Sequence, residues 1–323
     1  MSSPDSELTR SAQARPRLGG VLPERRRFFF VVNKQSGNYL KWLVQHRLGE
    51  FLTTEGVAAE IHYLKDETTL QRTLNRAYSE GYRSFIVVGG DGTVSLVASH
   101  LRHEDCSLGI VPVGTSNMIA QLLKIPMLPG RALELILESD STRAFDAISL
   151  GEHLFFLNAS VGLSSFSIAG LRSSEKTYLK LLAYVLAVAR GMRKARSRRY
   201  RVTVDEITTS IEAAELFVDN AGSLVMPRVR TSTARIDDGK AEICYVRKAD
   251  PVEFGKAILD VLLVRRNRQS FKHVASGSNV RIECEEVVPV QADGDSVSTT
   301  PVDISIVPAA TRFIVRQATD TSS

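Results

Sequence analysis

Apolar and polar residues alternate along the first 140 residues in blocks whose spacing predicts strands and helices in turn. Continuous apolar runs predict buried strands, and apolar residues three and four positions apart predict amphipathic helices. The predicted strands are Arg27–Val32, Ala59–Leu64, Phe85–Val88 and Leu108–Val111. The predicted helices are Leu40–Phe51, Asp66–Glu80, Val94–Leu101, a helix from about Met118, and Arg131–Glu138. This alternation predicts a Rossmann-like α/β domain with a parallel sheet over residues 25–140.

After about residue 141 the pattern changes to many short β-like runs bounded by Gly, Asp, Asn or Ser. Such runs predict an antiparallel β-sandwich or barrel, here over residues 141–299. The predicted strands are Ala144–Leu150, His153–Val161, Tyr200–Glu206, Ile211–Asp219, Ala241–Val246, Ser270–Val274, Asn279–Cys284, Val287–Gln291, Val302–Val307 and Arg312–Arg316. Two predicted helices, Lys176–Met192 and Val252–Val264, interrupt them. Residues 1–24 are polar with no apolar core, which predicts a disordered tail and not a secretory signal.

The composition is that of an ordinary globular protein. Of the 323 residues, 43% are hydrophobic and 24% charged, and the length suggests about two domains. No apolar run approaches the roughly 18–20 residues that span a bilayer. The three cysteines, Cys106, Cys244 and Cys284, lie far apart and show no metal-binding spacing. We therefore expect a cytoplasmic protein.

The net charge of +5 is modest, but part of it is concentrated. Arg190–Arg201 holds seven basic residues and no acid, directly after the apolar helix Lys176–Met192. A basic run of this kind is most often a solvated face. The pattern of the apolar helix is equally consistent with a core helix and with a helix that lines a slot for an acyl chain. Together they favour peripheral contact with an anionic membrane. No nucleic-acid-binding motif is present, so no nucleic acid is expected.

Two glycine-rich turns, Gly89–Thr93 and Pro112–Asn117, each follow a predicted strand and precede a predicted helix. The N–H groups and dipole at such helix starts attract phosphate. At the carboxyl ends of neighbouring parallel strands, the two turns would lie side by side. Asp91 among phosphates would need a cation or a ribose hydroxyl as partner. Plain strand–helix turns are the alternative reading.

These turns, GGDGT and PVGTSN, with the nearby Ile125-Pro126, resemble the catalytic domain of the diacylglycerol kinase and sphingosine kinase family, including the soluble bacterial-type lipid kinases. The resemblance implies a nucleotide-binding α/β domain, a β-sandwich domain for the lipid, and an active site in the cleft between them. It also implies that the chain over residues 300–318 returns to the first domain. NAD kinases and phosphofructokinases share the first turn.

The resemblance further implies ATP and Mg²⁺ as cofactors and assigns roles to residues. Asp293, in a late Ala292-Asp293-Gly294-Asp295 turn, matches the catalytic base. The nucleotide-binding positions are Asn33, Ser36, Gly37, Gly89, Gly90, Asp91, Gly92, Thr93, Gly114, Thr115, Asn117 and Asp295. A structural Mg²⁺ would take the carboxylate of Asp238 and the carbonyls of Arg235 and Lys240, and Asp146 would link this loop toward the active site.

Three positions depart from the family pattern. Leu96 and Met118 stand where the family often has acidic residues, and Asp295 stands where it usually has glutamate. The leading interpretation is an ATP-dependent kinase acting on a hydroxyl of a diacylglycerol- or sphingoid-type lipid at the membrane surface. The alternatives are a NAD kinase-like enzyme and a catalytically weak lipid- or nucleotide-binding regulator. A homodimer remains open.

Overall fold

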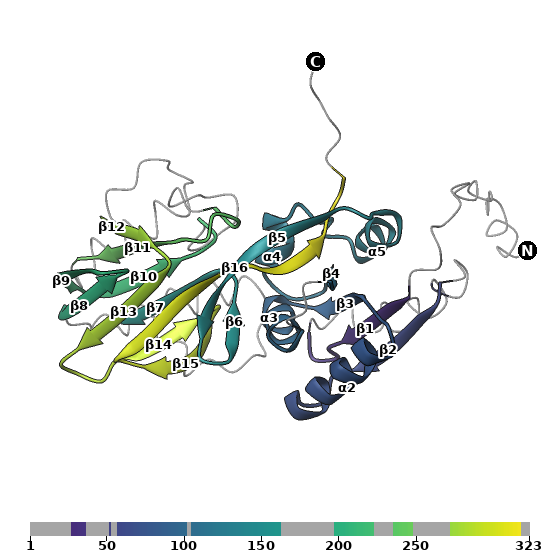
Figure 1. The fold of residues 1–323 in the computed structure, drawn as a ribbon, viewed down its shortest axis with the longest axis horizontal. Helices are drawn as coiled ribbons and strands as arrows, with labels where there is room; N and C mark the ends of the chain where they lie inside the picture. The colour runs from purple at the N-terminus through teal and green to yellow at the C-terminus, as the bar shows by residue number, and fades with distance from the viewer. Residues whose placement is uncertain are drawn as a thin grey trace, which may run out of the picture.

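A computed structural model describes residues 27–36, 52, 57–101, 105–162, 197–222, 235–247 and 272–317 (Figure 1). The predicted tail, the helices Leu40–Phe51, Lys176–Met192 and Val252–Val264, residue Gly37 and the basic run as far as Arg196 fall outside these residues. No helix in the described part of the chain is long and apolar enough to cross a membrane.

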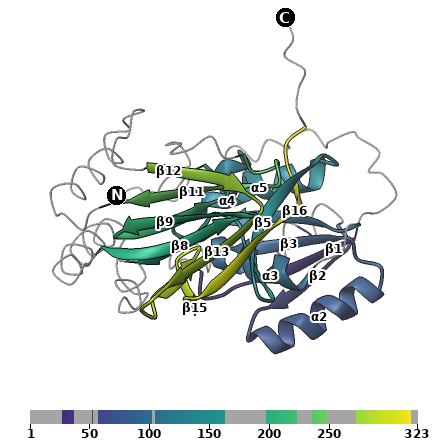
Figure 2. The same ribbon diagram turned by 60° about the vertical axis from the view of Figure 1, so that its left-hand side comes forward.

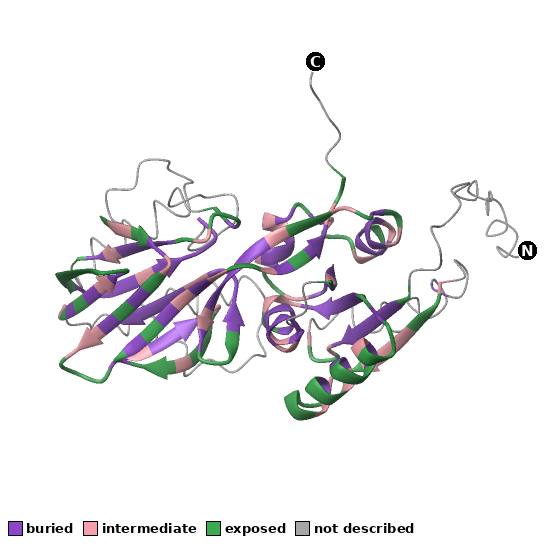
Figure 3. Ribbon diagram, in the orientation of Figure 1, coloured by how far each residue is buried: buried purple, intermediate pink, exposed green. Residues whose placement is uncertain are grey.

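The N-terminal part is built on four parallel strands in the order β2-β1-β3-β4. They span Phe28–Val32 (β1), Ala59–Tyr63 (β2), Ser84–Gly89 (β3) and Ser107–Pro112 (β4). All residues of β1 and β3 are buried (Figure 3). This is the burial expected of a parallel sheet covered on both faces, and it explains why these strands read as continuous apolar runs.

Helices cover both faces of that sheet. They span Glu67–Ser79 (α2), Asp91–His100 (α3), Met118–Leu122 (α4) and Pro129–Glu138 (α5). Helices α2 and α3 pack on the face that carries Phe29 and Phe85, whereas Leu133 and Ile136 of α5 pack on the face that carries Phe30. Figures 1 and 2 show α2 and α5 on opposite sides of the strands.

Strand β16 (Val302–Ile314) joins the two parts of the molecule. It pairs with β4 in parallel at one end, and with β5 (Thr142–Leu150) and β13 (Asn279–Cys284) in antiparallel. The same sheet continues through β8 (Arg198–Val204) to β9 (Ile207–Ala213), and β6 (His153–Phe155) pairs with β5. One ten-stranded sheet therefore runs through both parts.

A second, six-stranded antiparallel sheet faces the far end of the first. Its order is β12-β11-β10-β7-β14-β15. The strands are Asn158–Gly162 (β7), Glu215–Asp219 (β10), Ala241–Val246 (β11), Lys272–Gly277 (β12), Pro289–Ala292 (β14) and Asp295–Thr299 (β15). Tyr200 and Val202 of β8 share a buried core with Leu216 of β10 and Val290 of β14. The predicted α/β domain followed by an antiparallel β-sandwich is confirmed.

Several predicted strands have different limits in the structure. The predicted run Ile211–Asp219 changes sheets at Ala214, where β9 ends and β10 begins. The two predicted terminal strands form the single strand β16, with a register shift between Val307 and Thr311. The predicted strand His153–Val161 is divided into β6 and β7, with Phe156 and Leu157 between them.

Candidate active site

The two glycine-rich turns lie in direct contact at the carboxyl ends of β3 and β4. A Cβ atom added to Gly114 would lie 2.5 Å from Cα of Gly90, and one added to Gly90 would lie 3.1 Å from Cα of Gly114. Real Cβ atoms do not approach a backbone at 2.5 Å. Glycine at position 114 is therefore required for the turns to pack against each other, whether or not a phosphate binds there. A Cβ at position 90 would need the neighbouring backbone to shift by a few tenths of an ångström.

Asp91 and Asn117 hold the second turn in shape. The carboxylate of Asp91 accepts hydrogen bonds from Ser116 Oγ (3.0 Å) and from the N–H of Ile119 (2.9 Å), so it caps α4. Asn117 has a positive φ of 46°, accepts from the N–H of Gly114 (2.8 Å) and donates to its carbonyl (2.9 Å). These groups are committed to the protein itself, so the second turn offers fewer phosphate donors than its sequence suggests. Thr115 is exposed between them.

The first turn keeps an open helix start. Gly90, the N-cap of α3, provides no side-chain cap, so the first N–H groups of the helix can bind an anion. Asn33 donates its side-chain amide to Thr93 Oγ1 (2.8 Å), which links the turn after β1 to this helix start. Lys34 Nζ lies 4.0 Å from the ring centroid of Tyr63. Ser36 is half-buried, and Gly37 lies outside the described residues.

The carboxylate of Asp293 lies against helix α3, one turn beyond the first glycine-rich turn. Its Oδ2 accepts from Ser95 Oγ (3.2 Å) and the N–H of Phe156 (2.8 Å). Its Oδ1 accepts from the N–H groups of Leu157 (2.9 Å) and Asn158 (3.2 Å). Burial raises the pKa of Asp293 to about 6, although all four donors act in the opposite direction. The turn predicted to carry the base thus reaches helix α3 of the N-terminal part.

The interruption between β6 and β7 exists because of this carboxylate. The three consecutive N–H groups of Phe156, Leu157 and Asn158 all point to Asp293, and the N–H of Asp293 donates to the carbonyl of Asn158 (3.0 Å). No residue pattern indicates this break, because the stretch reads as one β-like run and the donors are backbone groups. These three residues and Ser95 are site residues that sequence reasoning missed.

Asp295 lies across from the first glycine-rich turn. It is exposed, and its Oδ2 lies 3.9 Å from the position of a Cβ added to Gly92. Leu96 and Met118 are partly buried and pack against the hydrophobic core of the N-terminal part. These two positions are therefore filled by packing groups, and the acidic side chains at the turn are Asp91 within it and Asp295 across from it.

The predicted metal loop is held by a buried aspartate. Asp146, 2% exposed, accepts from the N–H of Gly239 (2.6 Å) and the N–H of Ala309 (2.8 Å), and so ties the loop to β16. Asp238 is exposed, and its Oδ1 accepts from the N–H of Lys240 (3.1 Å). A carboxylate and backbone carbonyls are the oxygen donors that suit Mg²⁺. Among the described residues, no three His, Cys, Asp or Glu side chains gather as a metal site, so a metal here would depend on those carbonyls.

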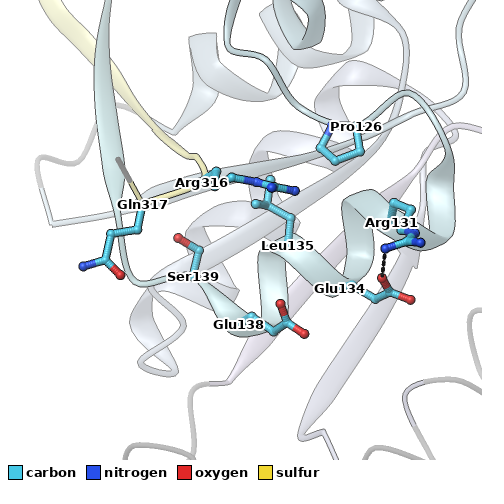
Figure 4. A pocket seen from close by; sticks show the side chains of 8 residues that line it. All are labelled: Pro126, Arg131, Glu134, Leu135, Glu138, Ser139, Arg316 and Gln317. Carbon is cyan, nitrogen blue, oxygen red and sulfur yellow. Dashed lines mark ion pairs between the residues drawn. The ribbon is translucent and has the colours of Figure 1, made fainter. Parts of the chain in front are cut away.

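A hollow of 570 Å³ lies elsewhere, beside α5 and the end of the last strand (Figure 4). It is lined by Pro126, Arg131, Glu134, Leu135, Glu138, Ser139, Arg316 and Gln317. None of these residues belongs to the turns or to the surroundings of Asp293. The hydrogen bonds around Asp293, and not this hollow, locate the candidate site.

Comparisons with known proteins match both parts of the chain. The diacylglycerol kinase catalytic domain matches residues 27–150, and the YegS C-terminal NAD kinase beta sandwich-like domain matches residues 162–315. An uncharacterized protein of Synechocystis sp. is 24% identical over 71% of this chain, and the match spans 54% of that longer protein. A protein of Pseudomonas aeruginosa with the name "Probable lipid kinase YegS-like" is 25% identical over 75% of this chain and 80% of its own length.

A solved structure has the same fold. The crystal structure of a diacylglycerol kinase from Bacillus anthracis is 21% identical in sequence, with a TM-score of 0.71 over 91% of this chain and 98% of that one. The order of the turns along the chain, the two family models and this fold all indicate the same family. The protein is a kinase that belongs to the diacylglycerol kinase-like family of lipid kinases, in which a diacylglycerol kinase catalytic domain precedes a YegS-type C-terminal domain.

Proposed function

We propose that this protein transfers the γ-phosphoryl group of ATP to a hydroxyl of a diacylglycerol- or sphingoid-type lipid. The observation that carries the proposal is the hydrogen bond between Asp293 and Ser95. It brings a half-buried carboxylate, suited to accept a proton near neutral pH, next to the helix whose start can bind phosphate. Phosphoryl transfer to a hydroxyl needs a proton acceptor beside the site that binds the phosphates.

The proposed roles follow from the geometry. The open N–H groups at the start of α3 bind phosphate oxygens, and Asn33 fixes that turn through Thr93. Asp295, exposed opposite Gly92, would help to hold the Mg²⁺ that accompanies the nucleotide, and the Asp238 loop would hold a second, structural Mg²⁺. Bound Mg²⁺-ATP would supply the phosphoryl group and neutralise its charge. Asp293 is the base that takes up a proton when the acceptor hydroxyl loses one.

The lipid acceptor implies contact with a membrane surface, and we propose that the basic run supplies part of it. Its described end lies on β8, where Arg198 pairs with Glu286 (2.7 Å) and Arg201 with Glu283 (3.8 Å). These two charges are partly neutralised within the protein. The proposed anionic-membrane contact therefore depends on the exposed Arg199 and on the basic residues before Ser197.

A lipid-panel assay tests the function. The full chain is incubated with Mg²⁺ and labelled ATP in mixed micelles that contain a diacylglycerol, a sphingoid base or ceramide, and in parallel with NAD. Labelled phosphate on a lipid, lost in Asp293→Asn, supports the proposal. Asp303→Asn is the matched control, because Asp303 lies on exposed β16 surface and pairs with Arg281 (2.7 Å), so it should keep wild-type activity.

The other readings make different predictions in the same assay. Transfer to NAD alone would show the NAD kinase-like enzyme. Binding of ATP or vesicles without transfer to any acceptor would show a regulator, the reading that Leu96 and Met118 favour because they replace charge by packing. Full activity in Asp293→Asn would reject Asp293 as the proton acceptor.

A further inference from the structure

The carboxylate of Asp293 has no vacant position for a substrate hydroxyl. A carboxylate accepts about four hydrogen bonds, and this one already accepts four, two at each oxygen. Three of the donors are consecutive backbone N–H groups fixed by the break between β6 and β7. An acceptor hydroxyl therefore cannot bind Asp293 without displacing a donor or passing its proton through one.

Ser95 is the one donor of the four that can pass a proton on. Its hydroxyl uses its hydrogen on Asp293 Oδ2, and makes no other hydrogen bond to the described part of the chain. A hydroxyl keeps two lone pairs for accepting, so Ser95 Oγ can receive a hydrogen bond from a second hydroxyl. Ser95 lies on α3, four residues after Asp91, and is only 4% exposed, which keeps bulk water from competing.

We propose that Ser95 is a further catalytic residue that relays the proton of the acceptor hydroxyl to Asp293. The inference rests on the proposed lipid kinase function. As the acceptor oxygen forms its bond to the γ-phosphorus of ATP, the bond from that phosphorus to the β,γ-bridging oxygen breaks and ADP leaves. The acceptor proton moves to Ser95 Oγ while the proton of Ser95 moves to Asp293 Oδ2. Ser95 ends as a neutral hydroxyl, and Asp293 later returns its proton to water.

The relay keeps every hydrogen bond of Asp293 in place throughout the transfer. Displacement of Ser95 would instead leave its buried hydroxyl in need of a new hydrogen-bond partner, and a buried hydroxyl without a partner is unfavourable.

Single-turnover phosphorylation of dioctanoylglycerol, or of whichever acceptor the wild type uses, tests the relay. Ser95→Ala should lower the rate by about 10²-fold or more, with unchanged ATP affinity and a folded protein. Ser95→Thr, which keeps a hydroxyl, should recover most of that loss. Ser95→Asn offers an N–H donor to Asp293 but no proton that can be relayed, so it should stay as slow as Ser95→Ala.

Ser99→Ala is the matched control. Ser99 is a buried serine one helical turn further along α3, and its hydroxyl accepts from the N–H of Leu154 (2.7 Å) without touching Asp293. If Ser95→Ala keeps the wild-type rate, exceeds it, or loses no more than Ser99→Ala, the relay is wrong. A fully active Ser95→Asn also rejects it, because Ser95 would then only position Asp293. A wild type that phosphorylates no lipid rejects the proposed function itself, which separates the two failures.

Discussion

The contact between the two glycine-rich turns predicts a large and specific loss of stability in Gly114→Ala. The new Cβ would lie 2.5 Å from Cα of Gly90 and 2.7 Å from Oδ1 of Asn117. Carbon atoms in contact prefer about 3.5–4.0 Å, so the turns would have to separate by about 1 Å. Overpacking of this kind costs about 1–3 kcal/mol. The two hydrogen bonds between Asn117 and Gly114 would also weaken, each contributing about 1 kcal/mol.

We therefore expect Gly114→Ala to lower the free energy of unfolding by about 4 kcal/mol. Urea denaturation followed by circular dichroism measures it. Gly130→Ala is the control, because a Cβ at Gly130 on α5 meets no atom within 4 Å and alanine favours helix. That change should stabilise the protein by about 0.5 kcal/mol. Equal unfolding midpoints for Gly114→Ala and the wild type would refute the turn–turn contact.

Gly92→Ala separates stability from phosphate binding in the same turn. Its Cβ would meet only Asp295 Oδ2, at an ordinary 3.9 Å, so the fold should tolerate it. If ATP approaches the backbone at the start of α3, the methyl group should weaken ATP binding by about tenfold or more while the unfolding midpoint stays unchanged. Isothermal titration calorimetry checks the affinity. An unchanged affinity for ATP would show that the nucleotide does not approach the backbone at Gly92.

Three further predictions concern the acidic residues. Asp91→Ala removes the cap of α4 and should cost about 1 kcal/mol in urea denaturation. Asp146→Ala leaves the N–H groups of Gly239 and Ala309 without their acceptor and should cost about 3 kcal/mol in the same measurement. The raised pKa of Asp293 predicts a pH–rate profile that falls below about pH 6, where the carboxyl is protonated and cannot accept a proton. The raised pKa means that the Asp293 carboxyl stabilises the folded protein most at acidic pH and less as pH rises through 6. Titration of Asp293 therefore does not unfold the protein below pH 6, and unfolding of this kind cannot cause the fall in rate.

Much of the architecture followed from the sequence because strand and helix patterns are local. Four buried runs and their helices predicted the parallel sheet, and short runs with polar boundaries predicted the antiparallel part. The errors fall where a non-local contact overrides the local pattern. The predicted strand His153–Val161 breaks at Phe156, where backbone N–H groups turn toward a carboxylate 137 residues away. The run Ile211–Asp219 changes sheets at Ala214, which no periodicity can show.

The chain by itself determined which turns carry glycine and aspartate, and in what order. Only the tertiary structure decided what those residues touch. Asp91 was predicted to face a cation or ribose, and the structure shows that it also caps α4. Gly90 and Gly114 were predicted to make room for phosphate, and they also make room for each other. Asp293 meets Ser95 across 198 positions of sequence. Hydrogen bonds to backbone groups have no residue signature, so their partners are fixed by how the sheets pack and not by the pattern along the chain.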